Sequence, residues 1–69
     1  MSRRDYPITI FYSEEDGGFI AIAPDLKWCT AFGETPQQAL RELETAMDLW
    51  LEVAARDSAP IPLPTRISA

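Results

Sequence analysis

Apolar and polar positions partly alternate at the start of the chain and later adopt a helical spacing. Tyr6 to Ser13 is rich in β-branched and aromatic residues, which is typical of a strand. Glu14 to Gly18 contains an Asp-Gly pair that readily supplies a positive φ, so this segment predicts a turn. Phe19 to Ala23, ended by Pro24, and Trp28 to Phe32 follow as further strands. The pattern therefore predicts a three-stranded antiparallel meander.

The register of the first hairpin stays open between two alternatives. If Tyr12 faces Phe19, one face of the sheet carries Ile8, Ile10, Tyr12, Phe19, Ala21 and Ala23. A slip of one residue instead places Ile8 and Ile10 on the same face as Ile20 and Ile22. Under either register both faces carry large apolar groups, and a single helix covers only one of them. We therefore expect the other face to be covered by an oligomer or a partner.

The strongest local signal is the start of a helix. Thr35 is a good N-cap, Pro36 suits the first helical position, and Gln38 completes a Thr-x-x-Gln capping box. The apolar residues that follow recur at helical spacing, and they are Ala39, Leu40, Leu43, Ala46, Met47, Trp50, Leu51 and Ala54. The helix is expected to end at Arg56 or Asp57, before the first of several prolines.

The C-terminal segment predicts little regular structure. Pro60 to Pro64 contains three prolines and is expected to be extended, polyproline-like or edge structure. Thr65 to Ile67 fits a short fourth strand. The 69 residues make one domain, 1–69, with 1–5 and 65–69 as tails. The expected fold is α+β, a three-stranded antiparallel meander with one long helix packed on it.

Composition narrows the classes of partner. The chain has 6 basic and 11 acidic residues and a net charge of −5. Direct nucleic acid binding is not expected, whereas a basic protein is a suitable partner. No apolar run approaches the roughly 20 residues that span a membrane, and the N-terminus lacks the apolar core of a signal peptide, so we expect a cytoplasmic protein. A single core of this size is marginal, which favours oligomerisation.

The residue types that usually carry catalysis are scarce. The chain has no histidine and one cysteine, which excludes a His-based triad and disfavours a structural zinc site. Cys29 is interpreted as a small buried residue. Glu14, Glu15 and Asp16 are expected at a solvated turn tip. We therefore expect no catalytic, metal or cofactor site; a carboxylate-based metal hydrolase is the alternative, and it requires carboxylates that converge in a cleft.

Two groups of residues are candidates for partner binding. The first lies between the second and third strands, and the second is an acidic ridge on the outer helix face; together they are Asp25, Lys27, Trp28, Glu44, Asp48 and Glu52. Trp28 fits a core or an interface equally well, since tryptophan commonly anchors both. Trp50 lies inside the helical stripe and is expected in the core. For the ridge, the simplest interpretation is a solvated face.

The order and spacing of several short motifs resemble a HicB-like antitoxin. They are Tyr6-Pro7-Ile8, Glu15-Asp16-Gly17-Gly18-Phe19-Ile20-Ala21, Pro24-Asp25-Leu26, Cys29, Gly33-Glu34-Thr35-Pro36-Gln37-Gln38-Ala39-Leu40, Trp50-Leu51-Glu52 and Pro60-Ile61-Pro62. The resemblance runs from about Tyr6 to Pro64. It implies a partial ribonuclease-H-like fold, self-association as a dimer or tetramer, and binding to a small basic ribonuclease toxin, HicA.

The chain also departs from that family. Lys27-Trp28 stands where the family often has Pro-Gly before the cysteine, so a different turn is expected. No DNA-binding domain follows in this sequence, so autorepression is not expected of it alone. The first strand, Ile8 to Tyr12, has no carboxylate to hold metal ions, which predicts a catalytically empty fold. The alternative function is a solitary homo-oligomeric module that binds a protein or a small ligand without any toxin.

Overall fold

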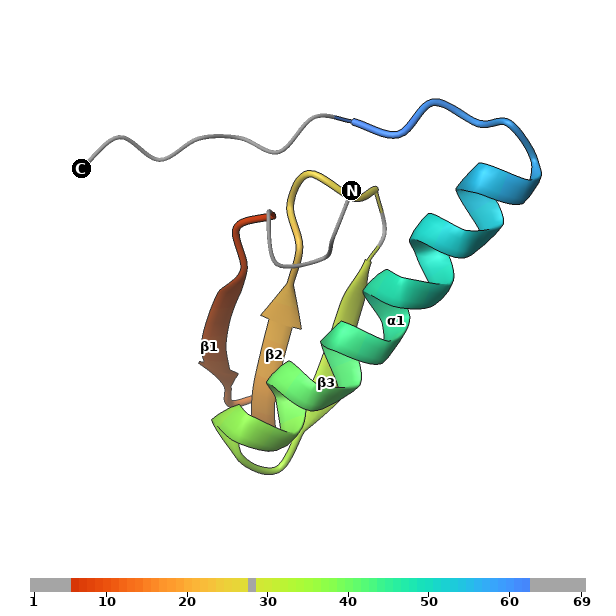
Figure 1. Ribbon diagram of the computed structural model, residues 1–69. Helices are drawn as coiled ribbons and strands as arrows, with labels where there is room; N and C mark the ends of the chain where they lie inside the picture. Colours follow the sequence, from red (N-terminus) through yellow and green to blue (C-terminus); the bar gives the residue numbers. More distant parts are fainter. Residues whose placement is uncertain (1–5, 28, 63–69) are drawn as a thin grey trace.

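A computed structural model describes residues 6–27 and 29–62. It contains three strands, β1 (Thr9–Ser13), β2 (Gly18–Ile22) and β3 (Thr30–Gly33), followed by one helix, α1 (Pro36–Arg56). The strands form an antiparallel sheet in the order β1-β2-β3, and α1 packs on one face of it (Figure 1). The predicted α+β meander with a single covering helix is confirmed.

The strand bounds differ from those that the sequence pattern suggested: β1 is shorter, β2 has the expected length but begins one residue earlier, and β3 begins two residues later and ends one residue later. β1 begins at Thr9, three residues later than predicted, because Pro7 has no N–H to donate and the Tyr6 hydroxyl instead donates to the carbonyl oxygen of Pro62 at 2.6 Å. β2 ends one residue early because the Ala23 carbonyl accepts from Leu26 N–H at 3.0 Å, which closes a turn. Trp28, the first residue of the predicted third strand, lies outside the described residues. The predicted short fourth strand, Thr65 to Ile67, also lies outside them.

The hairpin adopts the first of the two predicted registers, with Tyr12 opposite Phe19. The two rings meet edge to face with centroids 5.3 Å apart. The connecting turn is Glu14 to Gly17, since Gly18 already belongs to β2. Ser13 Oγ accepts from the N–H of Asp16 and donates to its carboxylate at 2.9 Å, and Gly17 supplies the positive φ of 69°. The hydrogen bonds of Asp16 and the positive φ of Gly17 therefore explain why an Asp-Gly pair stands in this turn.

Small residues on the sheet let α1 approach closely. Ala21, Ala31 and Gly33 lie on the helix-facing side of β2 and β3. At Gly33 the approach is so close that an added Cβ would lie 2.2 Å from the backbone nitrogen of Ala39. Around this contact the buried core gathers Tyr6, Ala21, Ala23, Leu26, Cys29, Ala39, Leu43 and Met47. No polar or charged side chain is buried within the described ranges.

Both ends of α1 are closed by local hydrogen bonds. The N–H of Gln38 donates to Thr35 Oγ1 at 3.0 Å, as a capping box predicts. The side-chain oxygen of Gln38 accepts from Glu34 N–H at 2.8 Å, one residue before the cap. The helix ends at Arg56 as predicted, and Ser58 takes the left-handed position that glycine usually fills, with a φ of 56°.

Candidate interaction surfaces

The structure places the first group of predicted site residues in the turn that connects β2 to β3. Asp25 is half-buried, Lys27 is exposed, and Trp28 lies outside the described residues. Between them, Leu26 is only 1% exposed and inserts into the core. The carbonyl oxygen of Lys27 accepts a hydrogen bond from the indole nitrogen of Trp50 at 3.0 Å. The backbone of this turn is therefore fixed to the helix, and Lys27 presents its side chain to solvent.

The acidic ridge lies along the outer part of α1. Asp48 and Glu52 are exposed and Glu44 is half-buried, which fits their position opposite the buried stripe. No group of three or more His, Cys, Asp or Glu side chains within residues 6–27 and 29–62 is arranged to hold a metal ion. The ridge is a charged helix surface and not a cleft, so its chemistry is that of a surface for cationic partners.

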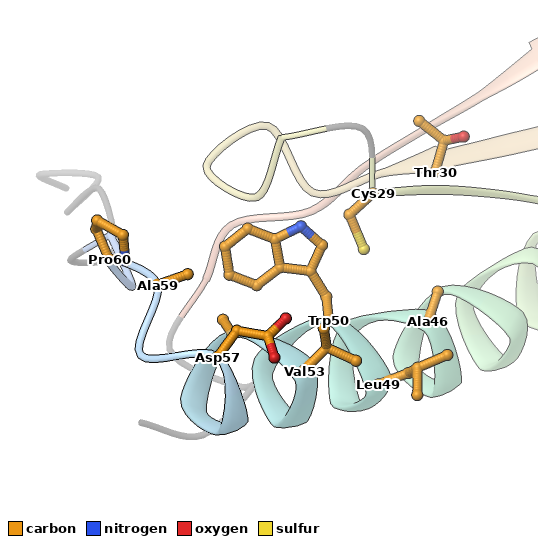
Figure 2. Close-up of a pocket in the computed structure, with 10 residues that line it drawn as sticks. Cys29, Thr30, Ala46, Leu49, Trp50, Val53, Asp57, Ala59 and Pro60 are labelled. Carbon is orange, nitrogen blue, oxygen red and sulfur yellow. The ribbon is translucent and has the colours of Figure 1, made fainter.

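An apolar groove lies on one flank of α1 (Figure 2). It has a volume of about 460 Å³ and runs from Ala46 past Trp50 to Asp57, at the end of the helix. Its ten lining residues are Cys29, Thr30, Ala46, Leu49, Trp50, Val53, Ala54, Asp57, Ala59 and Pro60. Asp57 supplies the only charged side chain among these ten. This surface is called the flank groove below.

Sequence reasoning missed the flank groove. Leu49 falls outside the predicted apolar stripe, and 59% of its surface is exposed. A large apolar residue on the solvent side of an otherwise amphipathic helix is the signal that could have revealed this surface. Trp50, which was expected in the core, is only half-buried and forms part of the groove wall.

Strand β3 forms one edge of the sheet, beside the flank groove. The N–H of Ala23 donates to the Cys29 carbonyl at 3.1 Å, which sets the alternation of hydrogen bonds between β2 and β3. The backbone groups that bond to β2 are therefore those of residues 29, 31 and 33. The N–H and C=O groups of Thr30 and Phe32 point outward from the edge of the sheet.

The sheet face opposite α1 forms a second apolar surface. Phe11, Ile20 and Phe32 stand side by side in one row across the three strands. Phe11 is 45% and Phe32 43% exposed, and Ile20 and Ile22 are half-buried. The strand residues that point to this face include no charged side chain. We call it the open sheet face, and it matches the prediction that one helix leaves large apolar groups uncovered.

Cys29 is free of any disulfide and its thiol is buried, as the sequence predicted. Burial raises the pKa of this thiol, because the apolar surroundings disfavour the charged thiolate. Cys29 is therefore a poor nucleophile at neutral pH and serves as a packing residue that lines one side of the flank groove.

No helix in the described part of the chain has both the length and the apolar character needed to cross a membrane.

No family model matches the sequence. Two relatives of similar length come from Synechocystis sp. (strain ATCC 27184 / PCC 6803 / Kazusa). The UPF0150 protein ssl0259 is 45% identical over 58 residues, which covers 84% of this chain and 78% of the relative. The UPF0150 protein ssr1765 is 33% identical over 58 residues, which covers 83% of this chain and 73% of the relative. The chain therefore belongs to the UPF0150 family of small proteins.

Proposed function

We propose that this UPF0150 protein is a HicB-like antitoxin module that binds and neutralises a small basic ribonuclease toxin. Membership of the family supports this proposal together with the ordered motifs from Tyr6 to Pro64. The observation that carries it is the distribution of charge. The chain has a net charge of −5, and the acidic ridge lies on the surface of α1. Such a surface steers and orients a cationic protein.

The proposed role is inhibition by binding, without catalysis. The one thiol is buried and its pKa is raised, so it is not an activated nucleophile. Asp25 lies in the β2–β3 turn, while Glu44, Asp48 and Glu52 lie along the outer surface of α1. These carboxylates are presented on different elements, which suits contacts spread over a partner surface better than a shared metal site.

We also propose that the protein self-associates through the open sheet face as a dimer or tetramer. Two copies that each carry a charge of −5 repel one another, so a face with no charged side chain is the least costly place for them to meet. Phe11→Ser is expected to weaken self-association by about tenfold or more, since a partly exposed phenylalanine loses its burial. Tyr12→Ser, on the other face of the same strand, is the control, and sedimentation velocity at micromolar concentration is the measurement. A wild-type monomer contradicts this proposal.

Rescue from growth arrest tests the toxin assignment. The gene is expressed in a host that carries the short basic protein encoded beside it, if one is present, under separate control. We expect rescue by the wild type and loss of rescue in the double variant Asp48→Lys with Glu52→Lys, which reverses the ridge. Glu14→Lys with Glu15→Lys makes the same charge change at the hairpin and is expected to keep rescue. Failure of the wild type to rescue its neighbour's arrest contradicts the assignment.

The second candidate is a solitary homo-oligomeric module that binds a small ligand without a toxin. The flank groove favours it, because its volume of about 460 Å³ is within the size range of small-molecule sites. This candidate predicts oligomers and no growth-arresting neighbour, so the genomic context and the rescue experiment separate the two functions.

A further inference from the structure

The flank groove and the edge of β3 form one continuous feature. α1 lies over β3 and the neighbouring β2, and Figure 1 shows its C-terminal half passing beyond the start of β3. Cys29 and Thr30 form one side of the groove, and Leu49 and Val53 form the other (Figure 2). The space beside the edge strand is therefore covered by an apolar helix flank.

The edge strand offers backbone groups to an incoming strand. Thr30 and Phe32 direct their N–H and C=O groups away from β2, and β3 contains neither proline nor a charged residue that would block pairing. An added strand would bond to these groups. Its residues opposite Cys29 and Ala31 would face the helix flank, and those opposite Thr30 and Phe32 would extend the open sheet face.

A second copy of this chain suits the same edge less well. If two β3 strands paired antiparallel about a twofold axis perpendicular to the sheet, they would lie about 4.8 Å apart and both helices would lie on the same face of the joined sheet. Since α1 packs on its own β3, the two helices would crowd each other above this edge and compete for the flank groove. An extended strand without a helix above it is therefore the better occupant of this edge.

The charge at the Asp57 end of the groove further restricts the occupant. Asp57 is the only charged lining residue, and it lies at the C-cap of α1, where the helix carries its partial negative charge. A cationic side chain on the occupant is attracted by both the Asp57 carboxylate and the helix end. The net negative charge of the whole chain adds to this attraction. The favoured segment alternates apolar residues and carries a lysine or arginine that reaches Asp57.

We propose that the edge of β3 and the flank groove together bind an extended basic segment of a partner protein by β-strand addition. Main-chain hydrogen bonds to Thr30 and Phe32 hold the segment, Leu49 and Val53 contact its apolar side chains, and Asp57 pairs with its cation. This inference rests on the proposed function only in taking the partner to be a basic protein. It assigns that partner a docking surface distinct from the acidic ridge and from the open sheet face.

A designed peptide tests the site directly. The probe is an acetylated, amidated peptide of alternating valine and threonine with a lysine at each end, titrated into the full chain and followed by backbone amide NMR. We expect shifts centred on Thr30, Phe32 and Leu49. A version with glutamate at each end is expected to bind about tenfold or more weakly. Shifts centred on Phe11 and Ile20, equal binding of both peptides, or no binding at millimolar concentration would overturn the proposal.

Matched variants on the same helix complete the test. Leu49→Asp is expected to weaken binding of the lysine probe by about tenfold or more, because a carboxylate replaces the exposed apolar contact. Thr45→Asp adds the same charge about one turn away, outside the lining residues, and is expected to bind at least as well as the wild type. Equal binding by Leu49→Asp and the wild type refutes the site. If rescue fails while the peptide binds as described, the toxin assignment is wrong and the docking surface stands.

Discussion

The indole nitrogen of Trp50 donates a 3.0 Å hydrogen bond to the carbonyl oxygen of Lys27, 23 positions earlier in the chain. This bond ties the C-terminal half of α1 to the turn between β2 and β3. Since Trp50 also lines the flank groove, the same residue fixes one wall of the groove and the position of the turn beside it.

Removing that hydrogen bond is expected to destabilise the domain modestly. Trp50→Phe keeps an aromatic ring but has no donor, so we expect a loss of about 1 kcal/mol in the free energy of unfolding. Trp50→Ala also removes the packing and is expected to cost more, about 3 kcal/mol. Urea unfolding followed by circular dichroism measures both. A Trp50→Phe variant as stable as the wild type would mean that the bond contributes nothing.

Gly33 is expected to be the least replaceable glycine. In Gly33→Ala the new Cβ would meet the backbone of Ala39, which cannot rotate away, so the helix start must move from the sheet. We expect a loss of about 3 kcal/mol, at the upper end for overpacking. The matched change Gly18→Ala meets the Phe32 ring, which can turn aside, and the Gly33 carbonyl oxygen at 2.8 Å, a less severe backbone contact than the 2.2 Å approach at Gly33. Both changes are therefore expected to destabilise, thermal unfolding should rank Gly33→Ala below Gly18→Ala, and the reverse order would contradict the close approach.

The end of α1 offers a stabilising substitution. Ser58 has a positive φ of 56°. The N–H of Ala59 donates to the Ala54 carbonyl at 2.8 Å, which is the six-to-one hydrogen bond of a Schellman motif. Because glycine adopts this conformation without a Cβ clash, Ser58→Gly is expected to gain about 1 kcal/mol. Ser58→Ala keeps the clash and serves as the control, with no gain expected. Denaturant midpoints compare the three proteins, and equal midpoints for the glycine and alanine variants would disprove the strain.

Burial of Cys29 predicts a specific dependence of stability on pH. Because the raised pKa of the folded thiol means that the folded state disfavours the thiolate, the contribution of this group is fully present below its ordinary value of 9.0. It is lost as the pH rises from there through the folded-state pKa. Urea unfolding between neutral and alkaline pH should show a steeper decline for the wild type than for Cys29→Ala. Parallel curves would show that the thiol does not contribute.

Local signals carried most of the fold prediction. The start of α1 depends on contacts between Thr35, Gln38 and their neighbours. The cap and the apolar stripe are therefore both recognisable from short stretches of sequence. The end at Arg56 was also predictable, although the serine at the left-handed position was not, because sequence preference there favours glycine. The hairpin register stayed open because both faces of β1 and β2 carry large apolar groups.

Non-local features could not be predicted. The flank groove depends on how far α1 extends past the start of β3, which follows from the close contact of Gly33 with Ala39 and not from any motif. The burial of Leu26 inside a turn is set by two backbone hydrogen bonds, from its own N–H to Ala23 and from Cys29 N–H to its carbonyl. The partner-binding roles of Asp25, Lys27, Trp28, Glu44, Asp48 and Glu52 remain predictions.

The order β1-β2-β3 has a consequence for how quickly the domain assembles. Each strand pairs with its neighbour in sequence, and α1 makes most of its sheet contacts with β3, the strand that directly precedes it, so contacts between consecutive elements dominate. The hydrogen bond from Tyr6 to Pro62 spans 56 positions and joins the two ends of the described residues. We expect rapid folding governed by the meander and α1, with the Tyr6–Pro62 contact made after the rate-limiting barrier. In stopped-flow kinetics, Tyr6→Phe should then accelerate unfolding and leave the folding rate almost unchanged.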